Sequence, residues 1–121
     1  MKPKIWLDKL SGVVRAKTSG SFTLDELRQC IKELKDFFSS TDKKYLLADV
    51  RENARVMASK EERKVMNELS KEFEWDKAAV TGADAFVRMS AKIVLAAMGK
   101  SKTTKFFKTE EEALAWLKGD E

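Results

Sequence analysis

The stretch Tyr45-Leu46-Leu47-Ala48-Asp49-Val50 decides the fold of this 121-residue chain. Its side chains form a nearly continuous apolar run, which is typical of a β-strand that is covered on both faces. A half-exposed strand would instead alternate apolar and polar residues. The segments on either side must therefore supply the elements that cover this strand.

Three capping boxes of the form S/T-x-x-E mark helix starts at Thr23, Ser59 and Thr109. In such a box the hydroxyl accepts from the third helical N–H while the Glu reaches back to the cap. Apolar residues at helical spacing follow each box, so each predicts a helix. A further helix is expected over about 84–98, with Asp84 as its N-cap and a stop before Gly99.

Short β-type runs separate these helices. Besides 45–50 they span 5–7, 13–18, 78–81 and 104–107. The predicted order is ββαβαβαβα over a single domain, residues 1–121. The first two strands are expected to form a hairpin, and the later ones to be parallel through right-handed crossovers. The fold class is therefore α/β, with a mixed sheet flanked by about four helices.

The composition excludes several function classes. The chain has no His, one Cys and one Pro. It therefore lacks a Ser-His-Asp or Cys-His nucleophile system, an imidazole-based zinc site, an internal disulfide and a CxxC pair. No carboxylate is spaced to complete an acid/base pair with Asp49. We expect a non-enzymatic protein without a metal or cofactor. Because no signal peptide or membrane span is evident, a cytoplasmic location is expected.

The net charge of +4 is basic but evenly mixed with acidic residues. A nucleic-acid binder usually carries a basic stripe with exposed aromatics, so no nucleic-acid partner is expected. One set of lysines precedes strands or follows helices: Lys43, Lys44, Lys77, Lys100, Lys102 and Lys105. Complementarity with the negative ends of helix dipoles explains this placement. The alternative is contact with an anionic membrane surface, at about 1 kcal/mol per basic residue.

The helix expected over 84–98 is apolar around most of its circumference. On a helical wheel Phe86, Met89, Ile93 and Ala97 form one apolar face, and Val87, Ala91, Val94 and Met98 form a second. A helix lying on a sheet needs only one such face. Either neighbouring helices cover the second face, or it lines a ligand cavity or a subunit interface.

The loop 51–58 follows the strand 45–50 at its carboxyl end, where open α/β sheets tend to bind ligands. Arg51 and Arg55 would lie beside helix N-termini, which favour anions. Val56 and Met57 are apolar residues in a loop. These four residues, with Phe86 and Met89, could accept a molecule with an acidic head and an apolar tail. The alternative is that Val56 and Met57 pack under a helix and the arginines are solvated.

An ordered series of short motifs resembles a known family. The motifs are Gly12-Val13-Val14-Arg15, Gly20 with Thr23, Leu46–Arg51, Ala79-Val80-Thr81-Gly82, Phe106-Phe107 and Glu111–Leu117. The series is similar to the SpoIIAA-like proteins, which are small bacterial relatives of STAS domains and, more distantly, of the CRAL-TRIO (Sec14-type) fold. The resemblance implies a mixed sheet flanked by helices, no catalytic chemistry, and binding of apolar ligands or partner proteins.

One motif of STAS-type anti-sigma-factor antagonists is absent. Those proteins carry an Asp-Ser-Ser-Gly-like turn, with a phosphorylated Ser, where this chain reads Arg51-Glu52-Asn53-Ala54-Arg55-Val56-Met57-Ala58-Ser59. Ser59 is the nearest hydroxyl at a helix start, where a phosphate would be favoured. Its expected role is that of an N-cap. Phosphorylation-dependent partner switching is therefore not carried over to this chain.

Two function hypotheses follow. The first is a binding module for a lipid or another apolar small molecule, with a pocket bordered by the 51–58 loop and the helix 84–98. The alternative is a protein-interaction or regulatory module in which that helix is buried in a homodimer or against a partner. The interface candidates for this alternative are Val87, Val94 and Met98.

Overall fold

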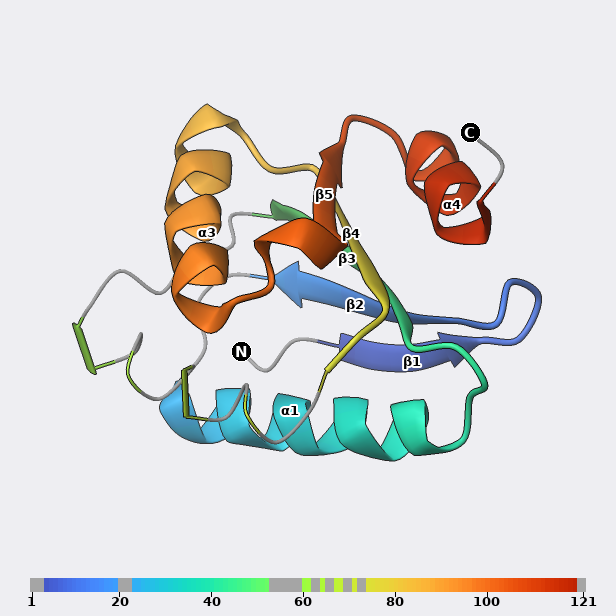
Figure 1. The fold of residues 1–121 in the computed structure, drawn as a ribbon, viewed down its shortest axis with the longest axis horizontal. Helices are drawn as coiled ribbons and strands as arrows, with labels where there is room; N and C mark the ends of the chain where they lie inside the picture. The colour runs from blue at the N-terminus through green and yellow to red at the C-terminus, as the bar shows by residue number, and fades with distance from the viewer. Residues whose placement is uncertain are drawn as a thin grey trace.

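The structure is a computed structural model that describes residues 4–19, 23–52, 60, 61, 64, 67, 68, 71 and 74–119. Its strands are β1 (Lys4–Asp8), β2 (Val13–Ser19), β3 (Tyr45–Glu52), β4 (Lys77–Thr81) and β5 (Thr104–Phe107). They form one sheet in the order β1-β2-β3-β4-β5 (Figure 1). β1 and β2 pair antiparallel and every later pair is parallel, which confirms the predicted hairpin and the parallel pairing of the later strands.

The helices begin where the sequence predicts. α1 (Leu24–Ser39) starts at Thr23 with both bonds of the capping box present. α3 (Ala85–Met98) is capped by the Asp84 carboxylate, and α4 (Glu110–Lys118) by the Thr109 hydroxyl. A short 3₁₀ turn, η1 (Ser101–Thr103), precedes β5. Of the helix predicted after Ser59, the described positions 60, 61, 64, 67 and 68 are helical. Ser59 and the apolar residues Val65, Met66, Leu69 and Phe73 lie outside the described residues.

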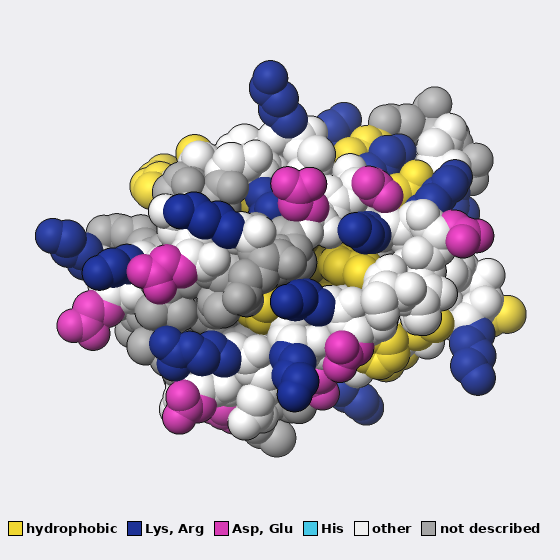
Figure 2. Space-filling view, turned by 60° about the horizontal axis from the view of Figure 1, so that its bottom comes forward, with side chains coloured by type: hydrophobic (Ala, Val, Ile, Leu, Met, Phe, Trp, Pro, Cys, Tyr) yellow, Lys and Arg dark blue, Asp and Glu magenta, His cyan; other side chains and the backbone are white. Residues whose placement is uncertain are grey.

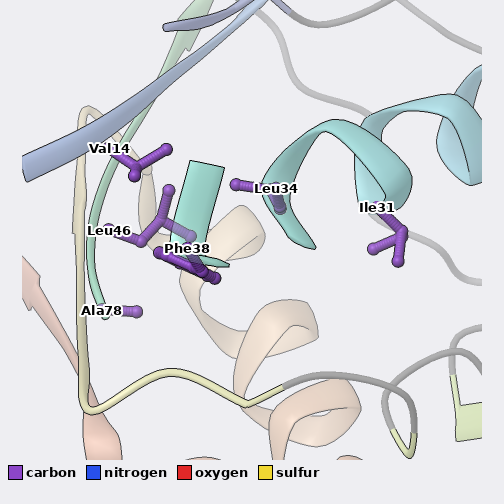
Figure 3. Packing of buried hydrophobic residues seen from close by; sticks show 6 residues of the cluster. All are labelled: Val14, Ile31, Leu34, Phe38, Leu46 and Ala78. Carbon is purple, nitrogen blue, oxygen red and sulfur yellow. The ribbon is translucent and has the colours of Figure 1, made fainter. Parts of the chain in front are cut away.

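α1 packs on one face of the sheet and builds the first hydrophobic core. Its buried members are Val14, Ile31, Leu34, Phe38, Leu46 and Ala78. Figure 3 shows Leu34 and Phe38 of α1 on the side of the helix that faces Val14 and Leu46 on the strands. Cys30 is buried beside this stripe, only 4 % exposed, as expected of a small apolar side chain.

α4 covers the other face and builds the second core from Val13, Leu47, Ala79, Ala113, Trp116 and Leu117. The two cores use consecutive residues of one strand, because neighbouring side chains point to opposite faces. Leu46 is 7 % exposed and Leu47 is 1 % exposed. The prediction that this strand is covered on both faces is therefore confirmed.

Arg15 ties β2 to its neighbours on the α4 face. Its guanidinium contacts the Asp8 carboxylate of β1, at 3.5 Å, and the Glu110 carboxylate in the first turn of α4. It also lies 5.7 Å from the centre of the Trp6 ring. Arg15 therefore links the edge hairpin to the helix that closes the second core.

Two lysines near the amino ends of the strands, Lys77 and Lys100, have different surroundings. Lys77 donates from Nζ to the Trp116 carbonyl oxygen in the last turn of α4, at 3.0 Å, as the helix-dipole interpretation requires. Lys100 is instead buried, at 7 % exposure, with Nζ 5.1 Å from the centre of the Trp75 ring. A cation can occupy such a site because the ring face is electronegative.

A pair of leucines tests the double-sided burial of β3. Leu47→Ala is expected to lower the free energy of unfolding by about 2–5 kcal/mol, because a cavity opens in the second core. The matched control is Leu10→Ala, since Leu10 is 101 % exposed. It should change stability by less than about 0.5 kcal/mol. Urea denaturation measures both, and similar losses in the two variants would contradict this packing.

The Asp8 carboxylate gives a pH-dependent prediction. Burial acts to raise the pKa of Asp8, but the hydrogen bonds from Leu10 and Ser11 and the charge of Arg15 outweigh it and lower the pKa. The ionised form therefore stabilises the fold above about pH 4, and this contribution is lost as the pH falls through the lowered pKa. Asp8→Asn should be less stable than the wild type at pH 7 and converge with it in acid. Urea denaturation at several pH values measures this. A difference in urea midpoint between the two proteins that stays the same at every pH would refute the prediction.

Candidate functional site

α3 exposes one side of its surface to solvent. Its inward side chains are half-buried and are Val87, Ala91 and Leu95. Its outward side chains are exposed and are Ala85, Arg88, Met89, Lys92, Ile93 and Ala96. Figure 1 shows the helix at the end of the molecule opposite the β1–β2 turn.

Two large apolar side chains lie on the outward side. Met89 is 67 % exposed and Ile93 is 59 % exposed. Residues four apart on a helix are surface neighbours, so these two side chains form one apolar patch. The prediction that α3 has more apolar surface than the sheet can cover is confirmed for these two positions, and no helix among the described residues buries them.

Cations border this apolar patch. Arg88 and Lys92 are exposed beside Met89 and Ile93, while the sequence of α3 contains no Asp or Glu. The Lys92 ammonium lies 6.0 Å from the centre of the Phe106 ring on β5. The surface therefore combines apolar contact area with positive charge.

Two adjacent hollows lie between α3 and the edge strand β5, and both are lined by Arg88 and Phe106. The first has a volume of about 480 Å³ and is also lined by Lys92, Leu95, Ser101, Thr104 and Lys105. The second has a volume of about 550 Å³ and is also lined by Gly82, Ala83, Asp84, Phe107, Lys108 and Glu112. We call the α3 patch and these hollows the α3–β5 surface.

The sequence-predicted site residues are only partly placed by the structure. Met89 lies on the α3–β5 surface, and Val87 is half-buried on the inner side of α3. Phe86, Val94 and Met98 belong to α3, and Arg51 belongs to β3, but their side chains are outside the description. Arg55, Val56, Met57 and Ser59 lie outside the described residues altogether. A pocket formed with the 51–58 loop stays a prediction.

Several lining residues were not predicted. Phe106 and Phe107 point to opposite sides of β5, so one faces α3 and the other lies 5.6 Å from the Trp116 ring. The sequence marks them as strand residues only. The i, i+4 spacing of Arg88 and Lys92 puts both on one side of α3, but this spacing alone does not distinguish a solvated position from one that borders a binding surface.

The described residues offer little for acid/base or metal chemistry. No group of three or more His, Cys, Asp or Glu side chains among them could hold a metal ion. Glu26, like Asp8, has a lowered pKa, because the backbone N–H of Thr23 donates to its carboxylate in the α1 capping box. Both of these shifts accompany structural hydrogen bonds. Within the described ranges, no helix is both long and apolar enough to cross a membrane.

The comparisons with known proteins identify the family. A protein-family model described as SpoIIAA-like matches residues 13–118. Because this match spans most of the chain, the chain belongs to the SpoIIAA-like family. A search of curated proteins found no match.

A solved structure shares the fold. It is that of the anti-sigma factor antagonist SpoIIAA in its unphosphorylated form, with a TM-score of 0.60 and 13 % sequence identity. The alignment covers 97 % of this chain and 96 % of that one. At this identity the likeness establishes the fold, which is the SpoIIAA/STAS arrangement that the sequence motifs predicted.

The exposure of the α3 patch can be tested by stability. Met89→Gln and Ile93→Gln are expected to change the free energy of unfolding by less than about 0.5 kcal/mol, since both side chains already face water. Leu95→Gln is the contrast, because Leu95 is half-buried on the inner side of α3. It should cost about 1 kcal/mol or more. Urea denaturation that shows equal losses at positions 93 and 95 would contradict this orientation of α3.

Proposed function

We propose that this protein is a non-enzymatic, cytoplasmic interaction module that binds a partner protein on the α3–β5 surface. The observation that carries the proposal is the exposed pair Met89 and Ile93, bordered by Arg88 and Lys92. Family membership agrees with it, since the SpoIIAA structure that shares the fold is that of an anti-sigma factor antagonist. The protein-interaction alternative of the sequence analysis fits these findings better than its lipid-binding hypothesis.

The charge of the surface defines the partner. α3 contributes Arg88 and Lys92 and no carboxylate. The hollows add Lys105 and Lys108 against the carboxylates of Asp84 and Glu112, so cations outnumber anions on this surface. A partner segment that bears Asp or Glu around apolar residues would be complementary in charge. Two copies of α3 placed together would bring like charges into contact. The charges therefore favour a different protein over a homodimer.

The apolar pair supplies the contact energy. Full burial of a Met or Ile side chain contributes about 1.5–3 kcal/mol, so removing Met89 and Ile93 from water favours binding. Arg88 is a suitable border residue, because a guanidinium can bind a carboxylate with two parallel hydrogen bonds. Hydrophobic contact would provide affinity, and the cations would provide orientation and rate of encounter.

The lipid-binding hypothesis stays a prediction without support from the comparisons. Its pocket depends on the 51–58 loop, most of which lies outside the described residues. The two hollows that the structure describes beside α3 are lined by charged residues on both sides, which suits a peptide better than an acyl chain. A second copy and a lipid are therefore treated as competing outcomes.

Photo-crosslinking tests the proposal directly. A photoreactive phenylalanine analogue at position 93 should crosslink one discrete partner protein in cells. The crosslinked segment of that partner should contain apolar and acidic residues. The same analogue at Lys35, an exposed position on α1, is the placement control. A second copy trapped at position 93 would support the homodimer instead, and equal trapping at positions 35 and 93 would contradict the site.

Charge reversal supplies the second arm of this experiment. Arg88→Glu with Lys92→Glu should lower the crosslinking yield at position 93 by about tenfold or more. Lys32→Glu with Lys35→Glu, on the exposed side of α1, is the matched control and should leave the yield unchanged. Mass spectrometry of organic extracts from the purified protein tests the competing hypothesis. A stoichiometric lipid, with no protein trapped, would overturn the proposal.

A further inference from the structure

A third hollow lies at the other end of the molecule, beneath the β1–β2 turn. Its volume is about 580 Å³. Its lining includes Leu7, Lys9, Asp42, Lys43, Tyr45 and Lys118. These residues come from the turn, the end of α1, the start of β3 and the last turn of α4. Figure 1 places this turn at the opposite end of the molecule from α3.

Three separate segments bring lysines to this hollow. Lys9 belongs to the turn, Lys43 precedes β3 and Lys118 ends α4, and all three side chains are exposed. One carboxylate, that of Asp42, lies among the lining residues. The Nζ atoms of Lys43 and Lys77 each lie 5.7 Å from the centre of the Tyr45 ring. Positive charge therefore exceeds negative charge around the hollow.

Leu10 lies in the chain between Lys9 and Ser11, two residues that line the same hollow. Its side chain is 101 % exposed, so it packs against nothing in the fold. The turn that carries it is nevertheless held in place. The Leu10 N–H donates to Asp8 Oδ1 at 3.0 Å, and the Gly12 N–H donates to the Asp8 carbonyl oxygen at 2.8 Å. Gly12 adopts φ 74°, which glycine allows without strain. A fixed turn thus presents an aliphatic side chain at its tip.

We propose that this end of the molecule docks on an anionic lipid bilayer. Leu10 enters the boundary between headgroups and acyl chains, while Lys9, Lys43 and Lys118 contact lipid phosphates. The hollow between the lysines receives a headgroup. An apolar anchor combined with clustered lysines is the pairing of signals that reversible membrane attachment requires.

A lipid surface fits these residues better than a nucleic acid. An aliphatic side chain at the tip of a turn gains nothing from a phosphate backbone, whereas an interface gives it an apolar environment. The large exposed apolar side chains of the described residues are Leu10, Met89 and Ile93, and none offers an aromatic ring for stacking on bases. Figure 2 shows Lys and Arg interspersed with Asp and Glu on the face it presents, without a continuous basic stripe.

The proposal is independent of the protein-binding surface. Docking through the β1–β2 turn leaves α3, at the opposite end of the molecule, facing away from the bilayer (Figure 1). A partner protein could then be bound on α3 while the chain lies on the membrane.

Vesicle co-sedimentation tests the proposal with the whole chain. Vesicles of phosphatidylcholine with phosphatidylserine should bind the protein, and vesicles of phosphatidylcholine alone should not. Added salt should weaken binding, because the lysines act through screened charge. Leu10→Ser should lower the partition coefficient about tenfold. Neutralising Lys9, Lys43 and Lys118 to Gln should lower it about 100-fold, at about fivefold per charge.

Matched variants separate this site from general charge and hydrophobicity. Ile93→Ser removes an exposed apolar side chain at the other end, and Lys32→Gln with Lys35→Gln and Lys108→Gln removes three exposed lysines elsewhere. Both controls should bind vesicles like the wild type. The proposal would be overturned if the controls lost as much vesicle binding as the test variants, or if anionic vesicles did not bind the protein. It would also be overturned if duplex DNA displaced the protein from vesicles equally well in the wild type and in Leu10→Ser. Ile93→Ser also reports on the α3 surface, so the two proposals fail separately.

Discussion

The double burial of β3 is the constraint on which the structure depends. Leu46 and Leu47 are consecutive residues in the middle strand of the sheet, and they belong to two different hydrophobic cores. A side-chain period of two forces them to opposite faces, so each face needs its own helix. α1 serves one face and α4 serves the other. A one-residue shift of this strand would exchange the side chains of both cores at once.

α3 carries more apolar side chains than its packing on the sheet buries. Val87, Ala91 and Leu95 suffice to seat the helix, and Met89 and Ile93 then face water. The proposed partner protein would cover these two neighbouring side chains, which contribute little to the stability of the free chain. Leu10, at the other end of the molecule, is also exposed, and the proposed bilayer contact would cover it.

The sequence predicts the elements well because their signals are local. Thr23, Asp84 and Thr109 cap helices through hydrogen bonds within three residues, and Gly99 and Gly119 end them in the left-handed conformation. The strand pairing follows from the order of elements, because parallel neighbours need a crossover. Local rules of this kind fix the fold class without knowledge of long-range contacts.

The candidate site was harder to predict because exposure is a long-range property. The periodicity of α3 shows two apolar faces, but which of them faces the sheet depends on the turn at Gly82 and on the position of β5. The hollows arise where Arg88 and Phe106, 18 positions apart, come together, and no spacing rule predicts that. Leu10 looks like an ordinary turn residue, since its complete exposure depends on the surrounding segments.

The central claim is that another protein covers Met89 and Ile93 inside the cell. Oxidative footprinting of Met89, on the purified chain and inside cells that produce it at native level, tests this most directly. The account predicts rapid oxidation of Met89 in the purified monomer and clear protection in cells. Equal oxidation in both settings would contradict it, and so would protection of Met89 in the purified protein alone.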